Sequence, residues 1–179
     1  YTFMPGPRGV AARAWGEVEM VPDPPYQDSA GLKIDTRMTL LQTADIGQEY
    51  LAVDQARDEL QHSDVKGRNP FKDLRVRKAV YHAIDVPLIV DKVLRGQAVP
   101  TGAFLSPLVD GSPAELDRRL PYDPARSRLL LGAAGYPNGF AVTLDCVNVA
   151  WRGNAAPAVR ALPPQGGRRT PASLHPTPP

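Results

Sequence analysis

The chain has 179 residues, of which twenty are proline and fifteen glycine, with a net charge of +2 and a single cysteine. A charge this close to zero argues against a nucleic-acid-binding or membrane-surface protein, and Cys146 alone supplies neither an intrachain disulfide nor a thiolate metal cluster. No apolar run approaches the roughly 18 residues of a membrane span, so the sequence is not that of a membrane permease.

Residues 1–70 contain short apolar runs separated by prolines, glycines and polar residues, a pattern that predicts short elements and loops. The predicted elements are, in order, a poorly defined start at 1–15, a strand at 16–25 that ends on prolines, a small helix at 26–34, strands at 36–43 and 49–53 joined by a turn at 45–47, and a polar connector at 54–70. Residue 1 is tyrosine and no signal segment opens the chain, so we expect a truncated amino end.

Residues 69–100 predict two consecutive amphipathic helices, each opened by an aspartate that accepts from free backbone N–H groups. After Asp73, apolar residues recur at helical spacing: Val76, Ala79, Val80, Ala83 and Ile84. After Asp85, Pro87 fits the first turn because its missing N–H is no loss there. The apolar face of this second helix is expected to contain Val86, Ile89, Val90, Val93 and Leu94. Gly96 is a typical helix stop.

A third helix is predicted after residue 122, where Asp123 precedes Pro124 and Gly135 ends the pattern. Its apolar surface comes from Leu129, Leu130, Leu131, Ala133 and Ala134. Residues 140–146 alternate between apolar and polar side chains and predict a strand. Helices and strands in this order indicate a mixed α/β fold class.

The character of the sequence changes at residue 150. The last thirty residues contain seven prolines and four arginines but no acidic residue, which predicts a disordered Pro/Arg-rich tail at 150–179. A second hypothesis is that this tail is translated out of frame, because residues 165–169 match what a one-base shift of GC-rich codons for Ala-Lys-Ala-Gly-Val produces. Both explanations remain open at this point.

Four segments, in order, resemble a known protein family. Residues 16–25 (GEVEMVPDPP) are similar to the family's G-E-V-D strand and turn, and residues 69–85 (NPFKDLRVRKAVYHAID) resemble its N-P-x-x-D-x-R-V-R-x-A-x-x-x-A-I-D segment. Residues 89–100 continue that segment, and residues 120–140 resemble its later Y-D-P…A-G-Y-x-x-G-F segment, with Ser127 where the family tends to carry alanine. The family is the peptide/nickel-binding family (family 5) of ABC-transporter extracellular solute-binding proteins.

The resemblance covers residues 16–149, which we expect to be a partial solute-binding-protein region. It implies part of a type II periplasmic-binding-protein fold: strands of the first lobe, the crossover, and the opening helices of the second lobe. It further implies the substrate-binding component of an ABC importer, with a peptide or other small solute as ligand and permease subunits as partners. The implied location is periplasmic, or that of a lipoprotein on the extracellular face. The family's clearest ligand contacts lie beyond this segment, so the ligand-binding residues stay unknown and no catalytic residue is expected.

The titratable residues suggest no further chemistry. His62, His82 and His175 are scattered and predict structural or surface roles rather than a metal site. The carboxylates of Asp45, Glu49 and Asp54 lack an activating partner, so we expect solvated turns and strand ends. Within this stretch, only Glu49 and Tyr50 are candidate ligand neighbours near a hinge.

Other readings follow from what the sequence lacks. It has no G-x-x-x-x-G-K-[ST] phosphate loop, so it is not a transporter ATPase. Arg75, Arg77 and Lys78 lack interleaved aromatics, which favours a solvated helix face over nucleic-acid contacts. The sequence therefore predicts a binding protein, without cofactor or metal and without enzyme activity, that is incomplete and unable to bind ligand alone. The alternatives are a small standalone α/β enzyme and a non-functional pseudogene product.

Overall fold

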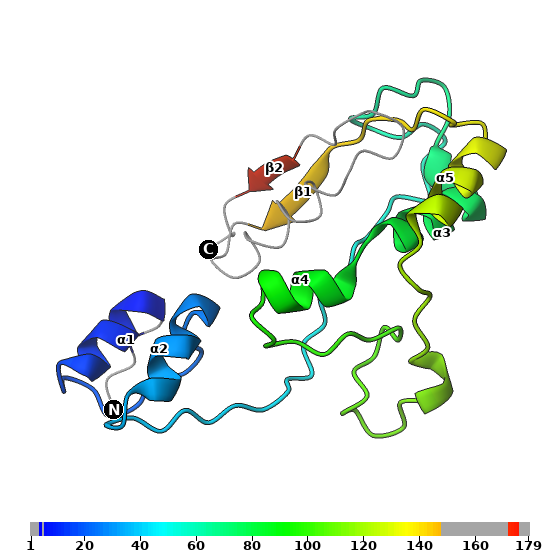
Figure 1. The fold of residues 1–179 in the computed structure, drawn as a ribbon. Coiled ribbons are helices and arrows are strands. Elements are labelled where there is room, and N and C mark those ends of the chain that lie inside the picture. Colours follow the sequence, from blue (N-terminus) through cyan, green and yellow to red (C-terminus); the bar gives the residue numbers. More distant parts are fainter. Residues whose placement is uncertain (1–3, 5, 148–171, 176–179) are drawn as a thin grey trace.

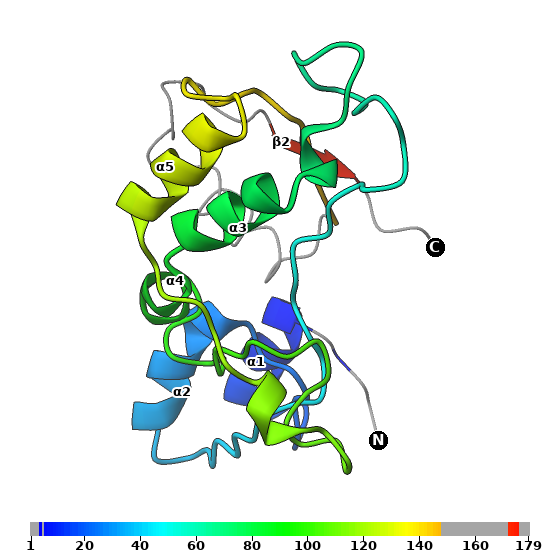
Figure 2. The same cartoon turned by 90° about the vertical axis from the view of Figure 1, so that its right-hand side faces the viewer.

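The computed structural model describes residue 4, residues 6–147 and residues 172–175. The helices and strands are α1 (Gly6–Ala14), η1 (Tyr26–Asp28), α2 (Ser29–Ile34), η2 (Pro70–Lys72), α3 (Leu74–Ala83), α4 (Val86–Lys92), η3 (Ala114–Leu116), α5 (Pro124–Ala133), β1 (Leu144–Val147) and β2 (Ala172–His175), where η marks a 3-10 helix. Figures 1 and 2 show α1 and α2 paired at one end, α3 and α5 paired at the other, and α4 between them.

The three aspartates begin their helices as the sequence predicted. Asp73 accepts a hydrogen bond from the backbone N–H of Arg75 at 2.8 Å, Asp85 from that of Leu88 at 3.0 Å, and Asp123 from that of Arg126 at 2.9 Å. Each bond satisfies one of the N–H groups that a helix start leaves unpaired and contributes about 1 kcal/mol. The stop predicted at Gly135 is confirmed, because this glycine follows the end of α5 and has φ of 88°, which non-glycine residues adopt at a cost. Helix α4 instead ends at Lys92, before the stop predicted at Gly96, whose φ is 76°.

The main core lies where α3 packs against α5. Val76 and Ala79 on α3 are fully buried, and Leu131 on α5 is nearly so. Ser127 lies in the crossing with no exposed surface, and its hydroxyl donates to the carbonyl of Ala79 at 2.8 Å. A small side chain there lets the helices approach closely, and the hydrogen bond satisfies its polar atom in the apolar surroundings.

Aromatic rings extend this core to the segments beside it. Phe71 packs edge-on against Phe140, with ring centroids 5.7 Å apart, and Phe140 lies 5.2 Å from Tyr136. Leu60 is buried in the same cluster. Residues 60 and 71 precede α3 whereas 136 and 140 follow α5, so the cluster joins two stretches that are distant in sequence.

A short set of backbone contacts reinforces this junction. Ser63 forms an antiparallel bridge with Val142, and its hydroxyl donates to the carbonyl of Ala141 at 2.8 Å. The Asp64 carboxylate accepts from the N–H of Ala141 at 2.8 Å, and the N–H of Thr143 donates to His62. The strand predicted at 140–146 is therefore present in two pieces: this bridge and β1, which begins at Leu144 and runs one residue past the predicted end.

The two strands predicted at 36–43 and 49–53 do not form in this structure. Residues 38–53 form neither helix nor strand, with a bend at Ile46, and no backbone-to-backbone hydrogen bond joins residues 39–53 to another described residue. A strand needs a neighbour to accept and donate along its edge, and the local pattern does not indicate whether one is present.

The amino-terminal region also differs from the prediction. The strand expected at 16–25 is a series of turns and bends, because Pro22, Pro24 and Pro25 remove backbone donors. Before it lies α1, in a stretch whose pattern predicted little. Gly9 permits the close approach of α1 to Met4, since a Cβ there would collide with the Met4 carbonyl. The small helix predicted at 26–34 is confirmed as η1 followed by α2.

Four residues of the tail depart from the expected disorder. Ala172–His175 forms β2, which pairs in parallel with β1 in the register Leu144 with Ala172 and Val147 with His175. The sequence gave no sign of this strand because it has only four residues, between Pro171 and Pro176. Its pairing with β1 supplies the backbone partners that a strand needs. The predicted tail residues 150–171 and 176–179 lie outside the described residues, as does the possible frame change at 165–169.

The basic residues of α3 were expected to face solvent. In the structure, two of them also donate hydrogen bonds to backbone carbonyl groups. The Arg75 guanidinium donates to the carbonyl of Ala133 at 2.7 Å, at the carboxyl end of α5. Arg77 donates to the carbonyls of Phe71 and Lys72 at 2.7 and 3.0 Å. Both therefore satisfy carbonyl groups at helix ends. Among the described residues, no helix is both long and apolar enough to cross a membrane.

Candidate functional site

A large open hollow runs between the two ends of the molecule. Its volume is about 2340 Å³, and it is bordered by residues 19–26, by segment 37–54, and by residues 83–101 from α4 and the loop after it. Ligand pockets that enclose a small molecule usually have roughly 300–1000 Å³. The hollow is therefore much larger than one small solute needs, and it is open along its length rather than enclosed.

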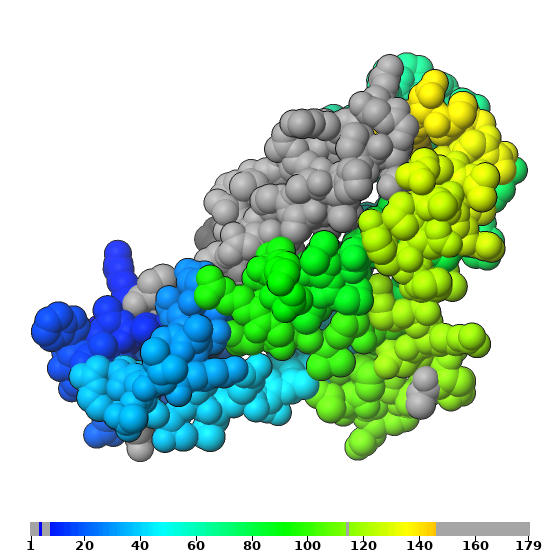
Figure 3. Space-filling view, viewed as in Figure 1, coloured from blue at the N-terminus to red at the C-terminus, as the bar shows by residue number. Residues whose placement is uncertain are grey.

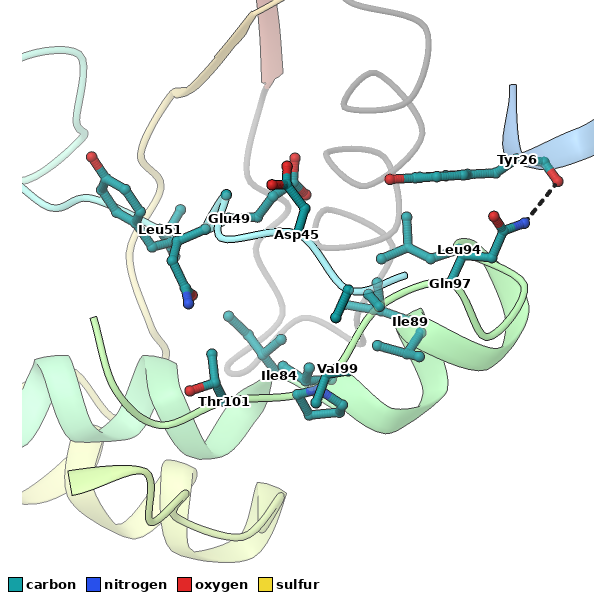
Figure 4. Close-up of a pocket in the computed structure, with 18 of the residues that line it drawn as sticks. Tyr26, Asp45, Glu49, Leu51, Ile84, Ile89, Leu94, Gln97, Val99 and Thr101 are labelled. Carbon is teal, nitrogen blue, oxygen red and sulfur yellow. Dashed lines mark hydrogen bonds between the residues drawn. The ribbon is translucent and has the colours of Figure 1, made fainter. Parts of the chain in front are cut away.

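One side of the hollow is acidic and centred on Tyr26. Figure 4 shows the Tyr26 hydroxyl directed toward the carboxylates of Asp45 and Glu49. Partial burial raises the pKa of the Tyr26 phenol above its ordinary value of 10.0, and the negative charges of Glu49, Asp23 and Asp45 raise it further. The phenol therefore stays protonated at neutral pH and presents a hydroxyl beside negative charge.

The opposite side is apolar and comes from α4 and from the residues just before and after it. Ile84, Ile89, Leu94 and Val99 face the hollow in Figure 4. Of the apolar face predicted for this helix, only Leu94 is buried, while Val86, Ile89, Val90 and Val93 are half-exposed. Helix α4 thus has one apolar side that the described residues cover only in part.

The loop after α4 fixes this helix to η1 and α2. Arg95 donates to the carbonyl of Gln27 at 3.1 Å. The Gln97 amide donates to the Ser29 hydroxyl at 2.5 Å and lies 3.5 Å from the Tyr26 carbonyl. Arg95 has a positive φ of 53°, which turns the chain sharply before Gly96. These contacts set the distance between the acidic and apolar sides of the hollow.

The rim of the hollow is a loop that folds back on itself. The Asp117 carboxylate accepts from the Thr101 hydroxyl and from the backbone N–H of Gly102, the latter at 2.8 Å. The hydrogen bond from Thr101 is the main cause that lowers the pKa of Asp117 below its ordinary value. Arg119 donates to the Thr101 carbonyl at 3.0 Å. The loop therefore has a defined shape although it contains only the short helix η3.

The structure brings together some of the carboxylates considered from sequence and separates others. Glu49 and Tyr50 both border the hollow, and the Tyr50 ring packs edge-on against Phe104 with centroids 5.0 Å apart. Asp45 lies near Glu49 and accepts from the backbone N–H of Ile46 at 2.7 Å. Asp54 instead closes a turn, where it accepts from backbone N–H groups and pairs with Arg57 at 2.6 Å. Sequence reasoning missed Tyr26, whose only signal was its place beside Pro24 and Pro25.

The histidines occupy separate sites. His82 is buried on α3, with Nδ1 2.8 Å from the Pro121 carbonyl oxygen, which is a structural role. His62 lies in an exposed turn with a positive φ of 53°, and His175 contributes its backbone to β2. No group of three or more His, Cys, Asp and Glu side chains suited to a metal ion occurs in the part of the chain that the structure describes.

Comparison with known protein families assigns the chain to a family of binding proteins. The sequence model of "Bacterial extracellular solute-binding proteins, family 5 Middle" matches residues 4–162. The chain belongs to this family of solute-binding proteins. The match extends at both ends beyond residues 16–149, on which the sequence resemblance rested.

Curated relatives agree with this assignment. The glutathione-binding protein GsiB of Shigella flexneri serotype 5b is 30% identical over 129 residues, which are 72% of this chain and 23% of the relative. GsiB of Escherichia coli O157:H7 is 31% identical over the same coverage. The chain thus spans less than a quarter of the length of these relatives.

Solved structures show the fold. The periplasmic binding protein DppA of Helicobacter pylori, in complex with the peptide STSA, superimposes with a TM-score of 0.72 at 20% identity, over 94% of this chain and 30% of that one. The murein tripeptide binding protein MppA of Escherichia coli gives 0.71 at 21% identity, over 94% and 32%. The expected fold class is confirmed: the chain has part of a type II periplasmic-binding-protein fold.

Proposed function

We propose that this chain is part of the substrate-binding component of an ABC importer for peptides or related small solutes. In this role it acts by non-covalent capture between two lobes, without enzyme chemistry, and passes the solute to permease subunits in the membrane. The corresponding place of action is the periplasm or the outer face of the cell membrane. Membership in a family of extracellular solute-binding proteins supports this role.

The single observation that carries the proposal is the open hollow of about 2340 Å³. One side is acidic, at Asp45 and Glu49, and the other is apolar, at Ile84 and Ile89. A peptide or amino-acid derivative presents both a cationic amine and apolar groups, so these two sides suit its chemistry. The relatives are a glutathione-binding protein, a binding protein in complex with the tetrapeptide STSA and a murein tripeptide binding protein, and these ligands belong to the same class of solute.

The hollow is open along its length, so its two described sides do not enclose a solute. An open wall leaves a solute largely hydrated, and binding then gains too little to offset the lost translational freedom. We therefore propose that the 179-residue chain alone does not bind peptides measurably and that capture requires an opposing lobe.

Two calorimetric titrations test this function. The first adds glutathione, dipeptides and tripeptides to the 179-residue chain, and no binding heat is expected. The second uses a chimera in which this chain replaces its matching segment in Escherichia coli GsiB, and binding of a peptide or glutathione is expected. A matched chimera with Glu49→Gln and Asp45→Asn is expected to bind more weakly. Micromolar binding by the chain alone would contradict the proposal that capture requires an opposing lobe. A folded chimera that binds no solute would contradict the proposed solute-binding function.

A further inference from the structure

The side chain of Gln97, in the loop after α4, joins that loop to η1 and α2. Its amide donates to the Ser29 hydroxyl at 2.5 Å and lies 3.5 Å from the Tyr26 carbonyl oxygen. The Ser29 hydroxyl donates to the same carbonyl at 2.7 Å. We call these three groups the Gln97 contact. Figure 3 shows the green residues at the end of α4 against the blue residues of α2, where this contact lies.

The backbone before Gln97 places its side chain against α2. Arg95 and Gly96 have positive φ of 53° and 76°, so two consecutive residues in the left-handed region reverse the chain after α4. The N–H of Gly96 donates to the Val90 carbonyl at 2.8 Å, and the N–H of Gln97 donates to that of Leu94 at 2.9 Å. The position of Gln97 is therefore set by a hydrogen-bonded turn.

The middle group of the Gln97 contact is buried. Ser29 is 6% exposed, and its hydroxyl uses both of its roles there, as acceptor from Gln97 and as donor to Tyr26. Loss of one partner in such a place leaves a polar group without the water that would replace it. The contact is therefore expected to hold its three groups in one arrangement.

Tyr26 depends on outside contacts for its position because η1 has only three residues. A helix this short is too short to be stable by itself, and its N-cap residue, Pro25, forms no capping side-chain hydrogen bond. Figure 4 shows the Tyr26 carbonyl directed toward Gln97 and the hydroxyl directed the other way, toward Asp45 and Glu49. A hydrogen bond to the carbonyl therefore also restricts where the phenol lies.

We propose that Gln97 is a positioning residue of the solute site, which through Ser29 and the Tyr26 carbonyl holds the Tyr26 phenol beside Asp45 and Glu49. This inference rests on the proposed function, because it assigns Gln97 a role in the same hollow. The phenol is the group that meets the solute, and Gln97 acts on the solute through it. The loop after α4 thus determines the polar chemistry on the opposite side of the hollow.

A titration of the Tyr26 phenol tests the positioning without any solute. Partial burial raises the pKa of this phenol above 10.0, and the charges of Glu49, Asp23 and Asp45 raise it further. Gln97→Met keeps a side chain of similar length but removes the amide donor. We expect the phenol to become more exposed and to move from the carboxylates, so that its pKa falls toward 10.0. Carbon-13 NMR of ring-labelled tyrosines in the 179-residue chain measures this pKa.

Two further variants make the titration specific. Gln55→Met changes an exposed glutamine that does not border the hollow and should leave the Tyr26 pKa unchanged. Ser29→Ala removes the middle group of the contact, should lower the Tyr26 pKa as Gln97→Met does, and decides the question if Gln97→Met does not fold. The signal of Tyr26 is assigned by its loss in Tyr26→Phe. An unchanged Tyr26 pKa in the folded Gln97 or Ser29 variant overturns the proposal, as does an equal fall in Gln55→Met.

Solute binding tests the consequence, in the chimera of this chain with Escherichia coli GsiB. Tyr26→Phe and Gln97→Met should each weaken glutathione binding about fivefold, the effect of one neutral hydrogen bond. The double variant should bind no more weakly than the weaker single variant, because both changes act through the same hydroxyl. Losses that multiply, or no loss in either single variant, overturn the proposal. A chimera that binds no solute contradicts the proposed function instead, and the phenol titration still decides the role of Gln97.

Discussion

The α3–α5 core and the segment 38–53 contain the same kinds of side chain in opposite surroundings. Val76 is fully buried between the two helices, whereas Leu41 is 87% exposed. Helices α3 and α5 form their backbone hydrogen bonds internally and find their packing partner within the described chain. Residues 39–53 form neither helix nor strand, and no backbone-to-backbone hydrogen bond joins them to another described residue.

This comparison shows which elements of the fold are self-sufficient. A helix pair with a polar residue satisfied at its crossing can pack as soon as its two helices meet. A strand of a larger sheet keeps its extended backbone but gains little until the rest of the sheet is present. The core is therefore expected to carry the stability of the chain, whereas segment 38–53 is expected to contribute little to it.

The largest expected effect is a charge placed in the core. Val76→Asp buries an unpaired carboxylate and should lower the free energy of unfolding by about 4 kcal/mol or more, which would abolish cooperative unfolding. Leu41→Asp, in segment 38–53, should change the free energy of unfolding by less than about 0.5 kcal/mol because the side chain stays in solvent. Urea titrations followed by circular dichroism measure both. Equal effects at the two positions would contradict the conclusion that the α3–α5 core, and not segment 38–53, carries the stability.

The next effect concerns Asn69, which connects the core to the end of segment 37–54. Its amide donates to the carbonyls of Asp54 and Arg57, both at 3.0 Å, while its oxygen accepts from the N–H of Phe71. Asn69→Ala leaves buried groups unpaired and should cost about 2–3 kcal/mol in urea unfolding. Asn69→Asp keeps only the acceptor. If it restored full stability, the helix cap at η2 rather than the two donated bonds would be the stabilising element.

A smaller effect is expected at the helix crossing. Ser127→Ala removes the hydrogen bond to the Ala79 carbonyl without adding volume and should lower stability by about 1 kcal/mol. Ser127→Val adds volume at a site with no exposed surface and should cost about 1–3 kcal/mol. Thermal unfolding of both variants, compared with the unchanged chain, separates hydrogen bonding from packing. A valine variant as stable as the alanine variant would show that the crossing is loosely packed.

The smallest effect is electrostatic and lies at the start of segment 37–54. The Arg37 side chain, mainly through hydrogen bonds, lowers the pKa of Asp35 from 3.8 to about 2. Because the folded pKa is depressed, this contact stabilises above about pH 4 and its contribution is lost as the pH falls toward 2. A carbon-13 NMR titration of the Asp35 carboxyl measures this value. Arg37→Ala should return the pKa toward 3.8, and an unchanged pKa would mean that the pair does not form in solution.

Much of the helical structure was predictable because its signals are local. Asp73, Asp85 and Asp123 each precede an apolar run, so capping and periodicity fixed where α3, α4 and α5 begin. Gly135 also marked the end of α5, whereas α4 ends before Gly96. The same reasoning failed for residues 36–53, since alternation indicates extended backbone but not its partner. It also missed β2, whose pairing with β1 links residues 144 and 172.

The candidate site was predicted least well. Glu49 and Tyr50 were candidate ligand neighbours from the sequence and border the hollow, but nothing near Tyr26 in the sequence indicated that it faces Asp45 and Glu49. The contacts of Arg95 and Gln97 with Gln27 and Ser29 span about seventy residues and hold the two sides of the hollow together. Such long-range contacts leave no periodic trace in a sequence.

By itself, the sequence determined helices α3, α4 and α5, the aspartates that cap them, and the family, because these depend on residue order over a few turns or on motifs with fixed spacing. Only the tertiary structure decided which apolar residues are buried, that Ser127 and His82 are structural, and that Tyr26 lies beside carboxylates from another segment. The physical reason is that burial and the electrostatic surroundings of a side chain depend on which distant segments meet, and hydrogen bonds within a helix do not specify that.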